Sequence, residues 1–432
     1  MNQRFDPSGP LRGALDTPPD KSISHRSALL AAMSDRPVRI SGYLRGEDTM
    51  STLRAVEALG ATVEDSGDDL VVRGCGLSGG LRSDIRIDVG NAGTLMRLLP
   101  GWLAGQPHGT WTLDGDESIR RRPVDRIALP LRAMGARLEA RERRLPPFTI
   151  EASRLTGIEY AMPVASAQVK SCVLLAGLLA AGETAVIEPE ASRDHTERML
   201  LGAGVDVRRD GLRVSLDRAE GIELPDLVVP GDPSSAAFHL AAAAVVPDSR
   251  ILLRNMGSNW TRTGFLRILE RMGATLGAEL EPAGAPLTRG EPVCDLEMAH
   301  AELRGTVVRA DEVPLAIDEL PLVALLGCFA EGETIVSGAA ELRVKESDRI
   351  ATVVDGLRGL GATIEATRDG FVVAGSGGLR GGVLHAHGDH RLAMLGAVAG
   401  LASAEGVEVV GMEAASVSYP GFVGDLAQLA VI

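Results

Sequence analysis

The segment DKSISHR, residues 20–26, puts two cations and a hydroxyl at the start of an expected helix. Lys21, Ser22 and Arg26 can together hold a carboxylate and a phosphate, because hydrogen bonds between ionised groups are the strong ones. The apolar run ALLAAM that follows indicates a buried helix. A capped surface helix is the alternative. We therefore expect an anion-binding site at the start of this helix.

A second charged segment, ELRVKESDR at residues 341–349, places a carboxylate between cations. Lys345, Glu346 and Arg349 fall within one helical entry, which suits anion binding and proton transfer alike. Ion pairing at the surface would produce the same pattern. Further along, GDHR adds Arg391 to the first turn of an apolar helix. The helix dipole disfavours a cation there, so capping does not explain it.

Two earlier segments extend the set of candidate anion sites. GNAGTLMR contains Gly93, where the missing Cβ lets the backbone approach an anion, and Arg97 in the same helix start. RRRPVDR contains Arg122. A capped buried helix and a solvated basic stretch explain these two patterns equally well.

Lysine is rare in this chain, since only Lys21, Lys170 and Lys345 are lysines among 44 basic residues. A chain that otherwise uses arginine keeps lysine mainly where a compact ammonium is required, unless the survivors are chance. Lys21 and Lys345 fall in the segments above. Lys170 lies two residues beyond Gln168, roughly on the opposite helical face, so we expect a structural role for it.

The composition excludes several classes of protein. A net charge of −14 argues against nucleic acid or an anionic membrane as the main partner. The longest apolar runs are too short to span a bilayer, and the N-terminus lacks the apolar core of a signal peptide. Four cysteines without C-x-x-C spacing suggest neither disulfides nor a metal site. We expect a cytoplasmic protein with small-molecule ligands.

The elements that position these residues repeat along the chain. Each repeat has an apolar helix, a short strand, and an amphipathic helix that ends in a glycine turn. The apolar helices begin near Lys21, Asn91, Ser166, Ser234, Asp318 and Asp389. The turn glycines are expected at positions 60, 135, 202, 273 and 361. Helices that are apolar on nearly all faces must be buried, so the sheets should lie outside them.

Three repeats per domain predict an α/β protein with two inside-out domains, in which sheets surround buried helices. We expect one domain at residues 16–229 and the other at residues 1–15 and 230–432. Equivalent repeats would place the buried-helix N-termini at one end of each domain. Two domains that face each other would then direct six positive dipole ends at one cleft, which attracts anions even in an acidic protein.

The chain resembles the 5-enolpyruvylshikimate-3-phosphate synthase family over nearly its whole length. The shared motifs are, in order, DKSISHR, GNAGTLMR, RRPVDR, SAQVKS, SRDHTE, GDPSSAAF, IDELP, RVKESDR and GDHR. One such motif would be weak evidence, whereas the ordered series is specific. The resemblance implies two inside-out α/β domains with the active site in the interdomain cleft, no metal or organic cofactor, and a monomer.

The resemblance also implies transfer of the enolpyruvyl group of phosphoenolpyruvate to the 5-hydroxyl of shikimate 3-phosphate, with release of phosphate. Residues matching the shikimate 3-phosphate ligands are Lys21, Ser22, Arg26, Ser166, Gln168, Arg193, Asp318 and Lys345. Those matching the phosphoenolpyruvate ligands are Lys21, Gly93, Arg122, Gln168, Arg349 and Arg391.

Addition of the hydroxyl to C2 and elimination of phosphate require proton transfers in both directions. We assign Asp318 as the general base and Glu346 as the proton donor to the methylene, with Lys21 as a second shuttle. Alternatively, Asp318 only orients a hydroxyl and Glu346 only neutralises its neighbours.

Two positions depart from the family pattern, and a third bears on inhibition. Ala167 stands where many members have a second serine, and Val417 stands where they have a lysine that contacts phosphoenolpyruvate. Glyphosate competes for the phosphoenolpyruvate site in this family. Because Gly93 leaves room there, the resemblance implies inhibition by glyphosate.

Three other functions compete with this one. The related transferase that acts on UDP-N-acetylglucosamine uses a loop cysteine, which the stretch 115–123 lacks. GCGLSG, at residues 74–79, fits the dinucleotide pattern G-x-G-x-x-G but leads into a strand, so we expect a hairpin turn. A non-catalytic anion-binding protein of this fold would have no need of Asp318 and Glu346.

Overall fold

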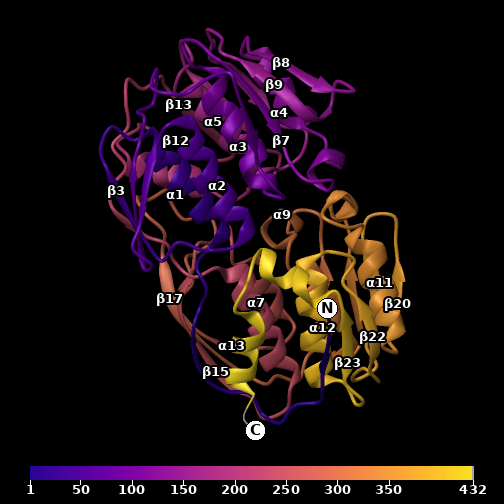
Figure 1. Cartoon of the computed structure of the whole chain (residues 1–432). Helices are drawn as coiled ribbons and strands as arrows, with labels where there is room; N and C mark the ends of the chain where they lie inside the picture. Colours follow the sequence, from indigo (N-terminus) through magenta and orange to yellow (C-terminus); the bar gives the residue numbers. More distant parts are fainter. Residues whose placement is uncertain (431–432) are drawn as a thin grey trace. The chain divides into compact units, whose positions relative to one another are not determined.

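The computed structural model describes residues 1–430, which form two compact units. Unit A comprises Lys21–Val229 and Pro286–Glu291. Unit B comprises Met1–Asp20, Pro230–Ala285 and the chain from Pro292 onward. In Figure 1 unit A runs mostly from indigo to magenta, and most of unit B is orange and yellow.

Unit A contains three four-stranded sheets. In strand order they are β14 (Leu227–Val228), β3 (Val38–Ser41), β5 (Asp69–Arg73) and β4 (Thr62–Asp65); β6 (Ile85–Asp88), β7 (Thr110–Asp114), β9 (Leu145–Glu151) and β8 (Arg137–Arg141); and β10 (Glu159–Ala161), β11 (Thr184–Ile187), β13 (Arg213–Leu216) and β12 (Arg208–Asp210).

Unit B contains two four-stranded sheets and one of three strands. They are β2 (Arg12–Asp16), β15 (Arg250–Gly257), β17 (Val293–Ala299) and β16 (Leu276–Gly277); β18 (Val307–Val308), β19 (Glu333–Val336), β21 (Phe371–Ala374) and β20 (Thr363–Ala366); and β22 (Gly382–His385), β23 (Val407–Val410) and β1 (Asn2–Phe5). In each of the six sheets, the strand given second pairs in parallel with one neighbour and antiparallel with the other. These strands are β3, β7, β11, β15, β19 and β23. The repeated topology matches the repeat expected from the sequence.

The apolar helices are buried inside their units, as the sequence predicts. They are α1 (Lys21–Met33), α3 (Gly93–Ala104) and α5 (Ala167–Gly177) in unit A, and α7 (Pro233–Val245), α10 (Leu320–Phe329) and α12 (His390–Ala402) in unit B. Every residue of α7 is buried, and so is every residue of α12 except Ala402. Alanine, leucine and glycine dominate both helices and leave no continuous polar face. Within unit B, α7, α10 and α12 each contact the other two, and Figure 1 shows α7 and α12 with strands outside them.

The amphipathic helices lie between this core and solvent. They are α2 (Glu47–Leu59), α4 (Asp125–Ala133), α6 (His195–Gly202), α8 (Gly264–Arg271), α11 (Arg349–Gly359) and α13 (Phe422–Leu429). Shorter helical segments are α9 (Val313–Ala316), η1 (Ile119–Arg121), η2 (Ala340–Val344) and η3 (Met412–Val417). The expected turn glycines have positive φ, with one correction: Gly202 is still helical, and Gly204 takes φ of +88°.

The N-terminal segment belongs to unit B as far as Asp20, five residues beyond the boundary expected from the sequence. Strand β2 pairs in parallel with β15, and the Asp20 amide donates to the Pro230 carbonyl at 2.8 Å. Residues 286–291 also differ from expectation, because they belong to unit A. There Oγ1 of Thr288 accepts from Arg198, and Glu291 pairs with Nδ1 of His195 at 2.7 Å.

The α/β architecture of two repeated units is therefore the one the sequence predicts. Within residues 1–430, none of the helices combines the length and the hydropathy that a bilayer crossing requires.

Candidate active site

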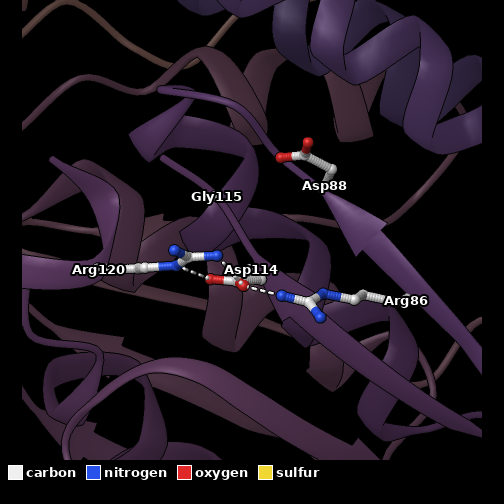
Figure 2. Close-up of a pocket in the computed structure, with 5 residues that line it drawn as sticks. All are labelled: Arg86, Asp88, Asp114, Gly115 and Arg120. Carbon is white, nitrogen blue, oxygen red and sulfur yellow. Dashed lines mark hydrogen bonds and ion pairs between the residues drawn. The ribbon is translucent and has the colours of Figure 1, made fainter. Parts of the chain in front are cut away.

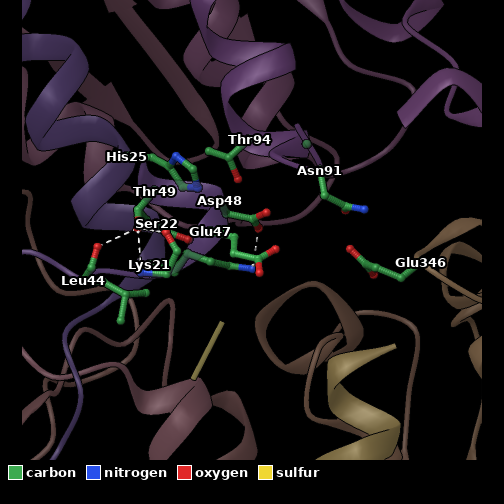
Figure 3. A network of polar contacts seen from close by, with 12 residues as sticks. Lys21, Ser22, His25, Leu44, Glu47, Asp48, Thr49, Asn91, Thr94 and Glu346 are labelled. Carbon is green, nitrogen blue, oxygen red and sulfur yellow. Dashed lines mark hydrogen bonds and ion pairs between the residues drawn. The ribbon is translucent and has the colours of Figure 1, made fainter. Parts of the chain in front are cut away.

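The first turn of α1 holds Lys21 and Ser22 side by side (Figure 3). Nζ of Lys21 lies 3.2 Å from Oδ2 of Asp48, a residue in the first turn of α2. The Lys21 side chain is 23% exposed. A carboxylate thus fixes the direction of an ammonium that solvent, and therefore a ligand, can still reach.

Arg26, one turn further along α1, is buried and held by neutral oxygens. Its Nε donates to Oγ1 of Thr196 at 2.8 Å, and its Nη2 donates to Oγ of Ser171 at 2.9 Å. Nη1 donates to the Ser22 carbonyl at 3.0 Å. These hydrogen bonds fix the direction of the guanidinium group, and a fixed guanidinium suits an anionic ligand.

Arg193 reaches the same turn from the loop before α6. Its Nη1 donates to Oγ of Ser22 at 3.4 Å. The structure therefore brings together Ser22, Arg26 and Arg193, three residues matched to shikimate 3-phosphate. Two guanidinium groups and a hydroxyl at one helix start are typical of a phosphate site.

Gly93, the first residue of α3, is in contact with two arginines. A Cβ atom at this position would lie 3.0 Å from Nη1 of Arg97 and 3.0 Å from Nη1 of Arg122. Nη2 of Arg122 donates to Oδ1 of Asn91 at 3.1 Å and to Oγ of Ser118 at 3.0 Å. The glycine is needed here because it leaves both guanidinium groups beside the backbone.

The start of α5 is tied to the start of α3. Oε1 of Gln168 accepts from Nη1 of Arg97 at 3.1 Å, and its Nε2 donates to Oγ1 of Thr94 at 3.1 Å. Ser166 is the N-cap of α5, and its Oγ accepts from the Val169 amide. The predicted residues Gly93, Arg122 and Gln168 thus belong to one connected cluster.

The loop that carries Arg122 is anchored at Asp114, the last residue of β7. Figure 2 shows its carboxylate between Arg86 and Arg120, beside a hollow of about 310 Å³. Arg120 holds both carboxylate oxygens, at 2.9 and 2.8 Å. The hydrogen bonds from Arg120, helped by the Gly115 amide and Arg86, lower the pKa of Asp114 to about 2. The pair therefore persists throughout the neutral range and fixes the segment that precedes Arg122.

In unit B, Arg349 is the centre of a buried ion-pair network. Its Nε lies 2.8 Å from Oδ2 of Asp389, its Nη2 lies 2.6 Å from Oε2 of Glu346, and its Nη1 lies 3.3 Å from Oδ1 of Asp318. Burial alone would lower the pKa of Arg349, but the three carboxylates raise it further than burial lowers it. Asp389 also caps α12 by accepting from the Arg391 amide at 2.9 Å.

Asp318 lies between two of the predicted cations. Nζ of Lys345 is 3.2 Å from the Oδ1 atom that Arg349 also contacts. The Asp318 side chain is 15% exposed and the Glu346 side chain 24%. Both carboxylates are therefore fixed by cations yet accessible, as acid–base residues must be.

Arg391 is joined to the starts of two other buried helices. Its Nη2 donates to Oγ of Ser234 on α7 at 2.6 Å, and that hydroxyl donates to Oε1 of Glu319, which precedes α10. Nη1 of Arg391 lies 3.7 Å from the same Glu319 oxygen. The N-termini of α7, α10 and α12 thus meet at this guanidinium.

Sequence reasoning missed the carboxylates that position the cations. Asp48 and Asp114 lie in none of the motifs, whereas Glu319 and Asp389 lie in IDELP and GDHR but were assigned no contact with a cation. A usable signal for Glu319 was its place beside Asp318 at the start of an apolar helix, where a buried carboxylate needs a cation.

The glycine-rich segment 74–79 is neither a dinucleotide loop nor the expected hairpin turn. It connects β5 to β6, which belong to different sheets. A Cβ atom on Gly74 would lie 2.5 Å from the Ala31 carbonyl oxygen, and the Cys75 amide donates to the Ala32 carbonyl at 2.8 Å. The segment therefore packs against the carbonyl end of α1, which repels a pyrophosphate.

Comparisons with known proteins agree with this geometry. A sequence model of EPSP synthase (3-phosphoshikimate 1-carboxyvinyltransferase) matches residues 5–426. The chain belongs to the EPSP synthase family. The 3-phosphoshikimate 1-carboxyvinyltransferase of Halorhodospira halophila is 48% identical over 99% of this chain and 96% of its own length. That of Desulfitobacterium hafniense is 46% identical over 97% of this chain and 95% of its own.

A solved structure of EPSP synthase from Acinetobacter baumannii superposes with a TM-score of 0.86 at 40% identity, and covers 99% of this chain and 98% of that one. The family recognised from the motifs is thereby confirmed, and so is the assignment as a transferase. Among residues 1–430, no three His, Cys, Asp or Glu side chains gather as they would around a metal ion.

Proposed function

We propose that this chain transfers the enolpyruvyl group of phosphoenolpyruvate to the 5-hydroxyl of shikimate 3-phosphate and releases phosphate. The observation that carries the proposal is the pair of guanidinium groups beside Gly93, in a member of the EPSP synthase family. Phosphoenolpyruvate carries a carboxylate and a phosphate next to the reacting carbon. The forked guanidinium group of Arg122 suits such an anion, and Arg97 lies beside it and holds Gln168.

Residues of both units serve the substrates in this proposal. Unit A supplies shikimate 3-phosphate ligands from the starts of α1 and α5 and from the loop at Arg193. Unit B supplies Asp318 and Lys345. The phosphoenolpyruvate ligands are Lys21, Gly93, Arg122 and Gln168 from unit A, and Arg349 and Arg391 from unit B.

The reaction proceeds by addition and then elimination. Asp318 accepts the proton of the 5-hydroxyl as its oxygen attacks C2 of phosphoenolpyruvate, and Glu346 gives a proton to the methylene carbon. The tetrahedral product then expels phosphate, while the methyl group returns a proton to the Glu346 carboxylate and the enol ether is restored. Lys21, whose ammonium is steered by Asp48, serves as a second proton shuttle beside the departing phosphate.

A phosphate-release assay tests the proposal directly. The purified chain is mixed with shikimate 3-phosphate and phosphoenolpyruvate, and phosphate release should require both compounds. Replacement of shikimate 3-phosphate by UDP-N-acetylglucosamine should give no release. Release only with the nucleotide sugar would assign the chain to the related transferase reaction and end the proposal.

We further propose that the enzyme acts as a monomer in the cytoplasm. One chain supplies every residue assigned above, and Cys75, Cys172, Cys294 and Cys328 are all free thiols, which suits a reducing compartment. Light scattering of the active enzyme should give a mass near 45.3 kDa. A stable dimer mass would contradict the monomer.

A further inference from the structure

The third lysine, Lys170, lies buried in unit A between two carboxylates. Its Nζ is 2.7 Å from Oε2 of Glu188, which follows β11, and 2.7 Å from Oε1 of Glu197 on α6. The Lys170 side chain is 1% exposed, and those of Glu188 and Glu197 are 5% and 1% exposed. Burial would lower the pKa of Lys170, but the charges of Glu197 and Glu188 raise it further. The ammonium therefore stays charged.

This ammonium binds one stretch of chain at three points. Glu188 and Glu197 lie at the two ends of this stretch. Between them, the Ser192 carbonyl oxygen lies 3.4 Å from Nζ of Lys170. Oγ of Ser192 donates to Oε1 of Glu188. Residues 188–194 thus form a loop that folds around Lys170 together with the first turn of α6, and Arg193 is the residue directly after Ser192.

A second set of contacts joins α5 and α6, the helices that carry Lys170 and Glu197, to Arg26. Ser171 follows Lys170 on α5, and Thr196 precedes Glu197 on α6. Their hydroxyls lie 2.7 Å apart, and each accepts a hydrogen bond from Arg26. The ion pair between Lys170 and Glu197 therefore sits beside the hydroxyl pair that holds the Arg26 guanidinium.

We propose that Lys170 is a positioning residue for shikimate 3-phosphate: it holds the loop 188–194 and the first turn of α6 so that Arg193 and Arg26 converge on the phosphate. The proposal rests on the proposed function. It also explains why the network is ionic, since a buried ion pair is often no more stable than apolar residues of the same volume but fixes its partners in one arrangement.

The alternative is that Lys170 only stabilises the fold, and steady-state kinetics separate the two roles. Lys170→Met keeps the length and removes the charge. We expect KM for shikimate 3-phosphate to rise by about tenfold to hundredfold, because small displacements of binding groups have effects of this size. KM for phosphoenolpyruvate, measured at saturating shikimate 3-phosphate, should change by less than about threefold, and kcat should fall much less than kcat/KM for shikimate 3-phosphate.

A second variant guards against the case in which Lys170→Met does not fold. Ser192→Ala removes only the hydroxyl that donates to Glu188, so it should raise KM for shikimate 3-phosphate alone, by a smaller factor. Ser153→Ala is the matched control, because Oγ of Ser153 donates to the Glu151 carbonyl and accepts from the Arg137 amide, two exposed backbone contacts in the same unit. Its two KM values should equal those of the wild type.

The outcomes distinguish this inference from the proposed function. Wild-type enzyme without activity on the two substrates refutes the function itself. If the wild type is active, the function stands and only the positioning role is in question. That role is overturned if folded Lys170→Met, or Ser192→Ala, shows both KM values unchanged or both raised equally.

Discussion

At the scale of single residues, the site depends on the absence of a side chain at Gly93 as well as on the positions of its charged groups. Gly93 has no Cβ, and both Arg97 and Arg122 use the space. A methyl group 3.0 Å from each Nη1 atom is too close, so both guanidinium groups would have to move by a few tenths of an ångström. Such a change alters an anion site without removing a charge.

Gly93→Ala should therefore weaken binding at the phosphoenolpyruvate site, and glyphosate should lose more affinity than phosphoenolpyruvate. We expect the inhibition constant for glyphosate to rise by about tenfold or more, a loss of about 1.4 kcal/mol. Gly202→Ala is the control, because a Cβ at that helical position meets nothing within 4 Å. Equal inhibition constants for wild type and Gly93→Ala would refute the assignment.

The acid–base assignment belongs to this scale too. Asp318→Asn and Glu346→Gln keep the size of each side chain and remove its proton chemistry. Each should lower kcat by about 10²–10⁴-fold in a folded protein. Asp355→Asn, an exposed change on α11, should leave kcat unchanged. Wild-type turnover in either test variant would show that the carboxylate only orients or neutralises.

At the scale of elements, helix starts were predictable and the supports of the cations were not. The start of α1 could be predicted because the apolar run and its first-turn cations are local in sequence. Glu319 contacts Arg391 only because α10 packs against α12. In the same way, Asp48 contacts Lys21 only because α2 packs against α1. Strand β14 has two residues and pairs with a strand formed by residues 38–41. Local patterning carries no signal for such distant pairs.

Two glycines at the C-terminal end of α6 give a test at the scale of elements. Gly204 has φ of +88°, whereas Gly202 is helical, and a Cβ would be uncrowded at both. Gly204→Ala should lower the free energy of unfolding by about 1–2 kcal/mol, since L-residues are strained in left-handed geometry. Gly202→Ala should be neutral or stabilising by about 0.4–1 kcal/mol. Urea unfolding followed by circular dichroism compares them, and equal midpoints would contradict the turn assignment.

At the scale of the whole molecule, the chain contains six copies of one helix–strand–helix repeat, but distant segments supply strands of some sheets. The N-terminal strands β1 and β2 complete two sheets of unit B, pairing with β23 and β15. The sequence repeat predicted that sheets would lie outside the buried helices. It did not predict which strand completes each sheet, because β1 and β2 pair with strands that are far away in the sequence.

The first apolar helix of each unit carries one buried histidine. His25 lies on α1 and contacts Oγ1 of Thr52, and His239 lies on α7 and contacts Oη of Tyr419 at 2.8 Å. Tyr419 donates its own proton to Asp425 at 2.6 Å, so Nε2 of His239 must be the donor to Tyr419. Burial lowers the pKa of His239 to about 4. The pKa of His25 is lowered by burial and by the charges of Lys21 and Arg26.

These histidines should make the protein less stable as the pH falls from about 6.5 to 4. The unfolded chain takes up a proton at each histidine below its ordinary pKa of about 6.5, while the folded protein does not. His239 should therefore remove about 1.4 kcal/mol of unfolding free energy per pH unit in this window, and His25 should act in the same direction. Asp114, with a pKa of about 2, loses its stabilising pair only below about pH 4 and does not obscure the effect.

Thermal unfolding between pH 4.5 and 7.5 tests this for unit B. His239→Phe removes the titrating ring from a cluster that already contains Phe238 and Phe422, so the variant should lose stability less steeply than wild type on acidification. His300→Gln, an exposed change in the same unit, should leave the wild-type slope. If wild type and His239→Phe show the same slope, the buried histidine is not a source of acid sensitivity.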